Sequence, residues 1–222
     1  MAVIETENPR RVVVVGASSP AGLATCTSLR AAGMRVVAVG SNSNRLADVS
    51  ADNHYVCDVS DATAVTALAE QIRREVGAPD GLIHLVGGWR AGQDDESWEF
   101  LNRQLITTLR NTSRAFHADL SASPAGRLAI ISSTSVDRPT WSNANYATAK
   151  AAAETWVAAI ASGWKKAGTA AAVTLVVRAI GTADGYTTPE TIAERITLLW
   201  TTPAVDINGK RIPLTPGHPL AP

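Results

Sequence analysis

The chain has 222 residues, 45% of them hydrophobic, which predicts one domain (1–222) with a substantial core. Twenty basic and twenty acidic residues cancel, and no basic stripe indicates a nucleic-acid surface. The two cysteines lack metal-ligand spacing, no apolar run approaches the ~18–20 residues of a membrane helix, and Met1–Glu7 is short and acidic rather than a basic leader. We therefore expect a cytoplasmic protein with no metal site and no membrane segment.

The chain begins with a strand, a glycine-containing turn and a helix. Val12–Val15 is a β-branched run typical of a strand buried on both faces. A helical pattern follows the turn and extends to Gly33. The N-terminus of such a helix offers N–H groups and a positive dipole end to a pyrophosphate. The candidate binding residues in the turn are Gly16, Ser18, Ser19, Pro20, Ala21 and Gly22.

The second strand, Arg35–Val39, ends about twenty residues after the turn, where a carboxylate would hold the ribose 2′-hydroxyl of NAD. The sequence has no carboxylate there. Ser41, Asn42 and Arg45 are instead placed to reach a 2′-phosphate, which favours NADP over NAD. The alternative is that Arg45 is a solvated charge at a helix start.

Two further strands end in residues of interest. His54–Cys57 is followed by Asp58 and Val59, and Asp58 is either a ligand-binding residue or the N-cap of an amphipathic helix over 62–76. The fourth strand, with its exit, covers 82–88. Its Gly87 and Gly88 would let a cofactor ribose lie against bare backbone. We interpret His84 in the same strand as a hydrogen-bonded structural residue rather than a base.

The second half of the chain holds the candidate catalytic groups. A long helix is predicted over 98–122, and Ser133 follows the buried strand 128–131 at the carboxyl end of the sheet. The next helix, Asn145–Trp164, places Tyr146 and Lys150 four residues apart on one face. A close ammonium favours the phenolate, so this pair predicts a proton donor and acceptor that works near neutral pH.

The remaining segments complete an alternation of strands and helices. The loop 134–145 carries Trp141, which is either a wall of the substrate pocket or a packing plug. A strand at 173–177 and a short connection follow. The last helix starts at 187–190, with Pro189 in its first turn, and runs through 192–200, and an edge strand at 210–214 closes the sheet. The pattern predicts an α/β fold with one doubly wound, Rossmann-type parallel sheet of about seven strands and helices on both faces.

Ser133, Tyr146 and Lys150, together with the turn after the first strand, resemble the short-chain dehydrogenase/reductase family over Arg11–Leu214. In this family the turn reads GxxxGxG, and Pro20 replaces the middle glycine. The resemblance implies that Asp58 receives the adenine amine and that the backbone at Gly181, with Thr182, meets the nicotinamide amide. It also places Gln104 at a helix asparagine that serves a proton path toward the lysine.

The resemblance implies an NAD(P)-dependent oxidoreductase that moves a hydride between the nicotinamide and a carbonyl or alcohol. Tyr146 would exchange the proton, Ser133 would bind the substrate oxygen, and Lys150 would lower the Tyr146 pKa and bind ribose hydroxyls. The rival hypothesis is a dinucleotide-binding sensor or scaffold without turnover. An epimerase or dehydratase of the extended short-chain branch does not suit the small C-terminal portion.

Relatives in this family pair their long helices between subunits. We therefore expect a homodimer or homotetramer, formed through the helices 98–122 and 145–164 and outward apolar residues such as Trp156 and Ile160. The expected partner is a small carbonyl or alcohol substrate.

Overall fold

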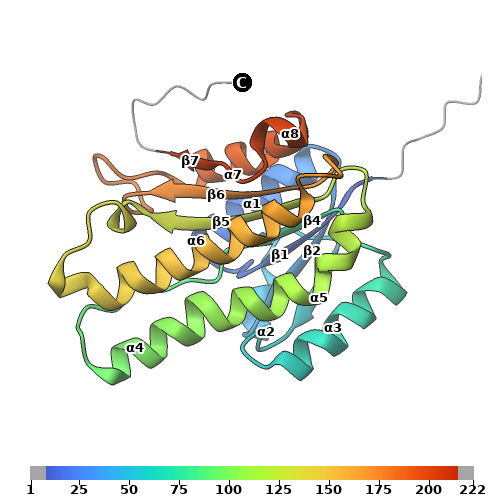
Figure 1. Ribbon diagram of the computed structural model, residues 1–222. Helices are drawn as coiled ribbons and strands as arrows, with labels where there is room; N and C mark the ends of the chain where they lie inside the picture. The colour runs from blue at the N-terminus through green and yellow to red at the C-terminus, as the bar shows by residue number, and fades with distance from the viewer. Residues whose placement is uncertain (1–8, 215–222) are drawn as a thin grey trace, which may run out of the picture.

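The computed structural model describes residues 9–214, so the acidic segment Met1–Glu7 lies outside the described residues. The predicted sheet is confirmed: seven strands form one sheet in the order β3-β2-β1-β4-β5-β6-β7, and all neighbouring strands are parallel (Figure 1). The strands are β1 Arg11–Val15, β2 Arg35–Gly40, β3 Asn53–Val56, β4 Gly81–His84, β5 Arg127–Ser133, β6 Ala171–Val177 and β7 Arg211–Pro213. The short β7, which contains a proline, is an edge strand as predicted.

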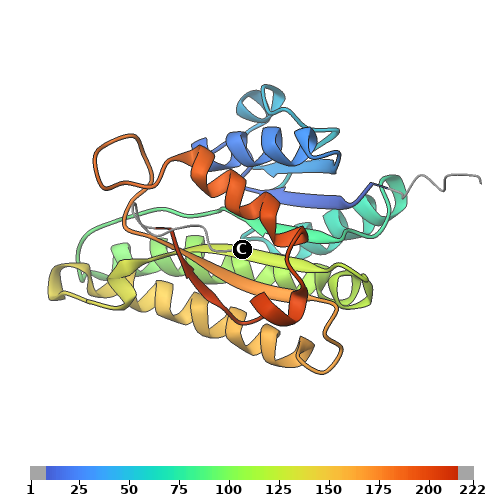
Figure 2. The same cartoon turned by 90° about the horizontal axis from the view of Figure 1, so that it is seen from above.

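Helices cover both faces of the sheet. The α-helices are α1 Pro20–Ala31, α2 Ser43–Ala47, α3 Ala62–Glu75, α4 Asp95–Leu101, α5 Thr108–Ala122, α6 Ala144–Trp164, α7 Pro189–Thr197 and α8 Ala204–Ile207. One hydrophobic core lies between the sheet and α3, α5 and α6. A second core lies on the opposite face, under α1, α7 and α8. Seen from above, the blue α1 and the red-orange α7 lie side by side on one face, and the green α5 and orange α6 lie on the other (Figure 2).

The strands form where sequence and burial agree. The four valines of β1 are at most 1% exposed, so this strand is apolar on both faces. β-Branched side chains suit such a doubly covered strand. Because the chain moves from β1 to β2 on one side and later to β4 on the other, the strand order reverses at β1. The carboxyl edge at that point is where open α/β sheets bind ligands.

The predicted continuous helix over 98–122 is corrected in two respects. It begins earlier, because Asp94 is the N-cap and its Oδ1 accepts a hydrogen bond from the Ser97 N–H at 2.8 Å. It is also interrupted by a π-helical segment, Asn102–Thr107, which separates α4 from α5. Just after this segment, the hydroxyl of Thr108, the first residue of α5, donates to the Gln104 carbonyl at 2.6 Å. Such bulges are frequent at functional sites.

Other boundaries moved by a few residues. The last long helix begins at Pro189 with Thr188 as its N-cap, as predicted, but it ends at Thr197, before a 3₁₀ turn at Leu198–Trp200. The predicted β3 shifts by one residue, to Asn53–Val56. Within residues 9–214, no helix has the length and apolar character needed to cross a membrane.

Candidate active site

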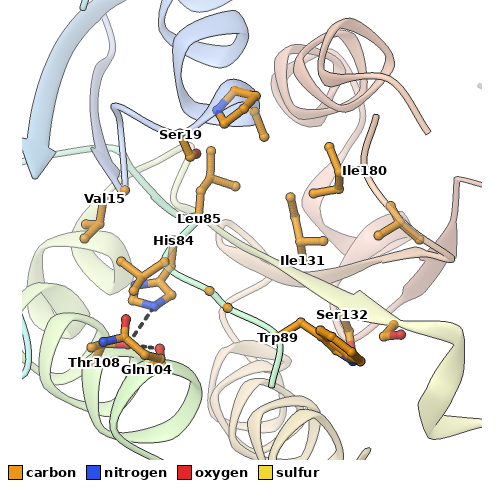
Figure 3. A pocket seen from close by; sticks show the side chains of 18 of the residues that line it. Val15, Ser19, His84, Leu85, Trp89, Gln104, Thr108, Ile131, Ser132 and Ile180 are labelled. Atoms are coloured by element: carbon orange, nitrogen blue, oxygen red, sulfur yellow. Dashed lines mark hydrogen bonds between the residues drawn. The ribbon is translucent and has the colours of Figure 1, made fainter. Parts of the chain in front are cut away.

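A cavity of about 880 Å³ opens at the carboxyl edge of the sheet (Figure 3). Most of the residues selected from the sequence line it: Gly16, Ser18, Ser19, Pro20, Ala21, Ser41, Arg45, Asp58, Val59, Gly87, Gly88, Gln104, Ser133, Tyr146, Lys150 and Gly181. Three selected residues do not line it, namely Gly22, Asn42 and Thr182. The sequence therefore located the cavity but overestimated how many residues face it.

Gly16 and Gly22 let the turn after β1 pack more closely than any side chain would allow. Gly16 has a φ of 79°, and a Cβ there would lie 2.8 Å from the carbonyl carbon of Leu85. A Cβ on Gly22 would lie 2.4 Å from the Gly16 carbonyl oxygen. Gly22 thus serves the contact between α1 and the turn, which corrects its assignment as a ligand-facing residue.

The start of α1 uses its polar groups internally. Pro20 occupies the first turn as predicted, since its fixed φ suits this position and it has no N–H. Ser19 is the N-cap, and its Oγ accepts the Gly22 N–H at 3.0 Å. The turn therefore offers an anion fewer donors than an all-glycine loop would.

The end of β2 carries a cation but no carboxylate. Ser41 and Arg45 line the cavity, and Arg45 Nη2 donates to the Ser18 carbonyl at 3.1 Å. This bond ties Arg45 to the turn, while its side chain remains exposed at the start of α2 as the alternative interpretation expects. Asn42 is the N-cap of α2, where its Oδ1 accepts the Arg45 N–H at 2.9 Å. Asn42 is therefore committed to the helix start and not to the cavity.

Asp58 lines the cavity, but its carboxylate already has partners. Oδ1 accepts from the Ser60 N–H and hydroxyl at 3.0 and 2.7 Å, and Oδ2 pairs with Arg103 at 2.9 Å. The Ser60 hydrogen bonds and then Arg103 lower the pKa of Asp58. The N-cap of α3 is Asp61, so the alternative interpretation of Asp58 as that cap is wrong.

His84 is a structural residue, as predicted. Its ring is 3% exposed and lies between two hydroxyls of α5, with Nε2 3.2 Å from Thr108 Oγ1 and Nδ1 3.1 Å from Thr112 Oγ1. Burial first, and then the charge of Lys150, lowers the His84 pKa to about 3. A ring that stays neutral near pH 7 is not a proton carrier there.

Lys150 and Tyr146 lie together on α6, with Lys150 Nζ 5.8 Å from the centre of the Tyr146 ring. Nζ donates to the Ile131 carbonyl at 2.7 Å, and burial lowers the Lys150 pKa to about 8. Burial also raises the Tyr146 pKa, while the adjacent Ser133 hydroxyl lowers it by less. The expected depression of the Tyr146 pKa by Lys150 is thus corrected, because desolvation outweighs the attraction of an ammonium nearly 6 Å from the ring.

Ser133 belongs to a hydrogen-bonded group that the sequence did not reveal. Ser133 Oγ accepts the Ser135 N–H and donates to Ser135 Oγ, both at 3.1 Å. Asn143 Nδ2 donates to Ser135 Oγ at 3.1 Å, and Trp89 Nε1 donates to Asn143 Oδ1 at 3.2 Å. The only sequence signal for this group was the concentration of small polar residues within 132–145.

Two loops at the mouth are joined. The segment after β4 and the segment after β5 are connected by Gln93 Nε2, which donates to the Trp141 carbonyl at 2.6 Å. Asn145 Nδ2 donates to the Asp94 carbonyl at 3.2 Å. Trp141 itself is 79% exposed and does not line the cavity, so neither the wall nor the plug interpretation holds. Trp89 supplies the aromatic wall instead (Figure 3).

The exit of β6 forms the opposite side of the mouth. Ile180 and Tyr186 line the cavity and are 41% and 39% exposed, whereas Thr182 is exposed and lies outside the lining. A single bridge between Ile180 and Thr187 closes this short loop and brings Tyr186 to the cavity. The sequence did not predict that Tyr186 lines the cavity, because residues in an irregular loop have no helix or strand periodicity that would show which way they face.

Gln104 and Ser132 add polar groups to the inner wall (Figure 3). Gln104 lies in the π-helical segment, next to the His84 cluster. The Ser132 hydroxyl is buried and has no hydrogen-bond partner among the described residues. No group of three or more potential metal ligands occurs in residues 9–214.

The chain shares sequence with known oxidoreductases. It is 28% identical over 152 residues to 2,3-dihydro-2,3-dihydroxybenzoate dehydrogenase of Bacillus subtilis (strain 168), covering 63% of this chain and 58% of that protein. It is 32% identical over 154 residues to the probable oxidoreductase EphD of Mycobacterium tuberculosis, covering 64% of this chain and 26% of that protein. The matches thus span little more than half of the first relative and about a quarter of the second.

Solved structures share the fold at low sequence identity. The NADPH-bound short chain oxidoreductase of Pseudomonas aeruginosa PAO1, described as containing an atypical catalytic center, gives a TM-score of 0.85 at 20% identity over 96% of this chain and 98% of that one. The ligand-free aldohexose dehydrogenase of Thermoplasma acidophilum gives 0.82 at 19% identity over 93% and 92%.

The sequence profile described as short chain dehydrogenase matches residues 10–194, which include the glycine turn, Ser133, Tyr146 and Lys150. With most of the chain matched, the protein belongs to the short-chain dehydrogenase family.

Proposed function

We propose that the protein is an NAD(P)-dependent oxidoreductase that transfers a hydride between the nicotinamide and a carbonyl or alcohol, with NADP as the preferred cofactor. The observation that carries the proposal is that Ser133, Tyr146 and Lys150 line the same cavity as the turn after β1. This arrangement joins a proton-handling group to an anion-binding helix start within one volume. Residues 1–222 would then be one NAD(P)-binding domain.

The cavity fits a dinucleotide in its shape and its donors. Gly16 leaves the turn backbone bare, and the N-terminus of α1 faces the same space. Gly87 and Gly88 expose backbone after β4, and the backbone at Gly181 lies on the far side. A bound ligand would also offer a partner to the orphaned Ser132 hydroxyl, which removes a desolvation cost of about 1–3 kcal/mol.

The choice of NADP rests on charge at the end of β2. Arg45 and Ser41 line the cavity there, and Gly40 stands where a repelling carboxylate would be. Asp58, an acidic residue of the lining, forms an exposed ion pair with Arg103 at 2.9 Å, which partly offsets its charge. The Pseudomonas oxidoreductase of the same fold is NADPH-bound, which agrees with this choice.

The chain's own residues handle the proton and the substrate oxygen, while the nicotinamide, when bound, supplies or accepts the hydride. In reduction the Tyr146 phenol gives its proton to the carbonyl oxygen, and its raised pKa keeps it protonated near pH 7. The Ser133 hydroxyl donates to the same oxygen as charge develops, and such a donor contributes about 2.7–4 kcal/mol. Lys150 Nζ, oriented by the Ile131 carbonyl, stabilises the phenolate that remains and would bind ribose hydroxyls. Gln104 is the candidate for continuing a proton path behind Lys150.

The test is titration with NADH and NADPH by cofactor fluorescence, followed by a carbonyl panel with the cofactor that binds. NADPH should bind more tightly, Tyr146→Phe should abolish reduction, and Ser133→Ala should lower kcat by about 100-fold or more. Both variants should keep NADPH binding and fold stability. Tyr55→Phe, which alters a phenol bonded to Glu75 outside the cavity, controls for the loss of a tyrosine hydroxyl.

A sensor or scaffold is the second candidate. It is favoured by the Ser133 proton, which is donated to Ser135 rather than into the cavity, and by Pro20, which removes a donor. Binding of NADPH without turnover across the panel would support this candidate, and the absence of any dinucleotide binding would contradict both.

We also propose a homodimer or homotetramer assembled through α5 and α6. The two residues named from the sequence are less available than expected. Trp156 Nε1 donates to Ser113 Oγ at 2.9 Å, and both Trp156 and Ile160 pack against the core. The outward face of α6 is instead formed by small residues such as Ala158 and Ala159.

A further inference from the structure

A cation that the sequence analysis did not single out lines the cavity near Ser133. Arg178 is exposed, lines the cavity and directly follows Val177, the last residue of β6. Val177 is the register partner of Ser133 in the neighbouring strand β5. Because parallel strands lie about 4.8 Å apart, the Arg178 backbone is one residue beyond the nearest β6 neighbour of Ser133. Its long side chain can therefore reach a molecule that is bound against Ser133.

The loop after β6 holds the guanidinium in place. A Cβ built on Gly185 would lie 3.3 Å from Arg178 Nη1, so the guanidinium packs against bare backbone of this loop. Gly185 has a φ of 74°, a conformation that favours glycine. The next residue, Tyr186, also lines the cavity. The loop thus presents a cation and an aromatic ring to the same space.

The Arg178 guanidinium has no partner among the described residues. The ion pairs within 9–214 do not include it, and it makes no side-chain hydrogen bond there. Asp184 belongs to the same loop, but it neither pairs with Arg178 nor lines the cavity. Of the described lining residues, Asp58 is the one acid, and it follows β3 at the far edge of the sheet. Near Ser133 the charged lining residues are Lys150 and Arg178, so this part of the cavity attracts anions.

The strand order separates this cation from the places proposed for the cofactor's phosphates. The pyrophosphate is expected at the start of α1, after β1, and the 2′-phosphate at the end of β2. In the sheet, β6 is three strands from β1 and four from β2, about 14 and 19 Å at the usual spacing. Figure 3 shows Ile180, two residues after Arg178, across the cavity from Val15 at the end of β1. An anion on the substrate therefore suits Arg178 better than an anion on the cofactor.

We propose that Arg178 is a specificity-determining residue that binds a carboxylate or phosphate group of the substrate, so that the protein acts on anionic carbonyl or alcohol compounds. The planar guanidinium can hold either group through two parallel hydrogen bonds. Trp89, Ile180 and Tyr186 supply apolar surface for the rest of the molecule. The inference rests on the proposed function, because it names the substrate class of the same site.

The first test compares substrates with and without the charge. Aldehydes and ketones are assayed with NADPH in matched pairs, each as a carboxylic acid and as its methyl ester, beginning with 4-carboxybenzaldehyde. In the wild type, kcat/KM should be about tenfold higher for the acids than for the esters. Arg178→Ala should remove this preference by lowering kcat/KM for the acids alone. Arg178→Lys should keep part of it, because it retains the charge but not the planar fork.

A second measurement does not need turnover. Sodium benzoate and the neutral benzamide are titrated by calorimetry into the cofactor-free protein and into its NADPH complex. Benzoate should bind more tightly than benzamide. Arg178→Ala should weaken benzoate by about tenfold and leave benzamide unchanged. The affinity for NADPH should be the same in the wild type and in this variant.

Two matched variants remove other cations. Lys166→Ala deletes an exposed charge outside the lining and should change neither the acid preference nor benzoate binding. Arg45→Ala should weaken NADPH binding and leave the acid preference intact.

Three results would overturn the inference: an equal loss for acids and esters in Arg178→Ala, unchanged benzoate binding, or a loss of NADPH affinity in its place. The last result would assign the guanidinium to the cofactor's pyrophosphate. If the wild type reduces no carbonyl compound, the proposed function fails, and the benzoate titration still decides whether Arg178 forms an anion site.

Discussion

At the scale of single residues, Lys150 shows that sequence spacing predicts where a side chain lies, whereas its pKa depends on how deeply the fold buries it. The i, i+4 relation with Tyr146 was readable in the sequence, and both side chains line one cavity. The pKa values were not readable, since they depend on burial. Desolvation lowers the Lys150 pKa to about 8 and raises that of Tyr146.

This pair gives the proposed reduction an alkaline limit. Lys150 is charged below pH 8 and neutral above it, whereas the Tyr146 phenol stays protonated well beyond that pH. We expect kcat/KM for reduction, which reports the pKa values of the free enzyme, to be level below about pH 8 and to fall as the pH rises through this value. Steady-state rates on both sides of that pH provide the check. In Lys150→Arg the guanidinium stays charged, so the fall in rate should move to a higher pH. A wild-type rate that stays level well above pH 8 would refute the assignment to Lys150.

The packing role of Gly22 can be tested by adding a single methyl group at this position. In Gly22→Ala the new Cβ would lie 2.4 Å from the Gly16 carbonyl oxygen and 2.5 Å from that of Ala17, and such backbone atoms cannot move aside as a flexible side chain could. We expect a loss of about 3 kcal/mol in the free energy of unfolding, measured by urea denaturation. Gly163→Ala is the matched control. A Cβ there meets nothing within 4 Å inside α6, so stability should rise by about 0.5–1 kcal/mol.

At the scale of elements, the start of α1 shows a trade between stability and ligand contact. Pro20 restrains the unfolded chain and begins the helix, but it supplies no N–H to an anion. Pro20→Gly should therefore lower the free energy of unfolding by about 1 kcal/mol and tighten NADPH binding by several-fold. Fluorescence titration beside urea denaturation measures both, and weaker binding in the variant would show that the proline preorganises the turn.

Element types followed from the sequence better than element boundaries did. Alternating strand and helix patterns predicted all seven strands, and the inner strands were the clearest, because a strand covered on both faces needs a continuous apolar run. The π-helical segment at 102–107 was not predictable, since it depends on how α4 and α5 pack. The contacts within the loops at the cavity mouth could not be predicted either. Trp89, Ser135 and Asn143 are joined by tertiary hydrogen bonds, one of which links residues 54 positions apart.

At the scale of the whole molecule, the proposed assembly can be tested on α6. Ala159 is exposed on the outward side of this helix, so Ala159→Arg adds a bulky charge without touching either core. Sedimentation should show a dimer or tetramer for the wild type and a monomer for the variant. Tyr55→Phe, which changes the edge strand β3 rather than α6, should leave the assembly unchanged. A wild type that sediments as a monomer would contradict the proposed interface.

The joined loops at the cavity mouth have a consequence for how molecules enter. The Gln93 side chain donates to the Trp141 carbonyl, and the Asn145 side chain donates to the Asp94 carbonyl. These bonds join the two loops on one side of the cavity mouth. On the opposite side, the loop with Ile180 and Tyr186 is closed by a β-bridge and by backbone hydrogen bonds such as that from the Gly181 N–H to the Thr187 carbonyl at 3.1 Å. Because the backbone is hydrogen-bonded on both sides, we expect a small molecule to enter by displacing the exposed side chains that line the opening, Trp89, Ile180 and Tyr186.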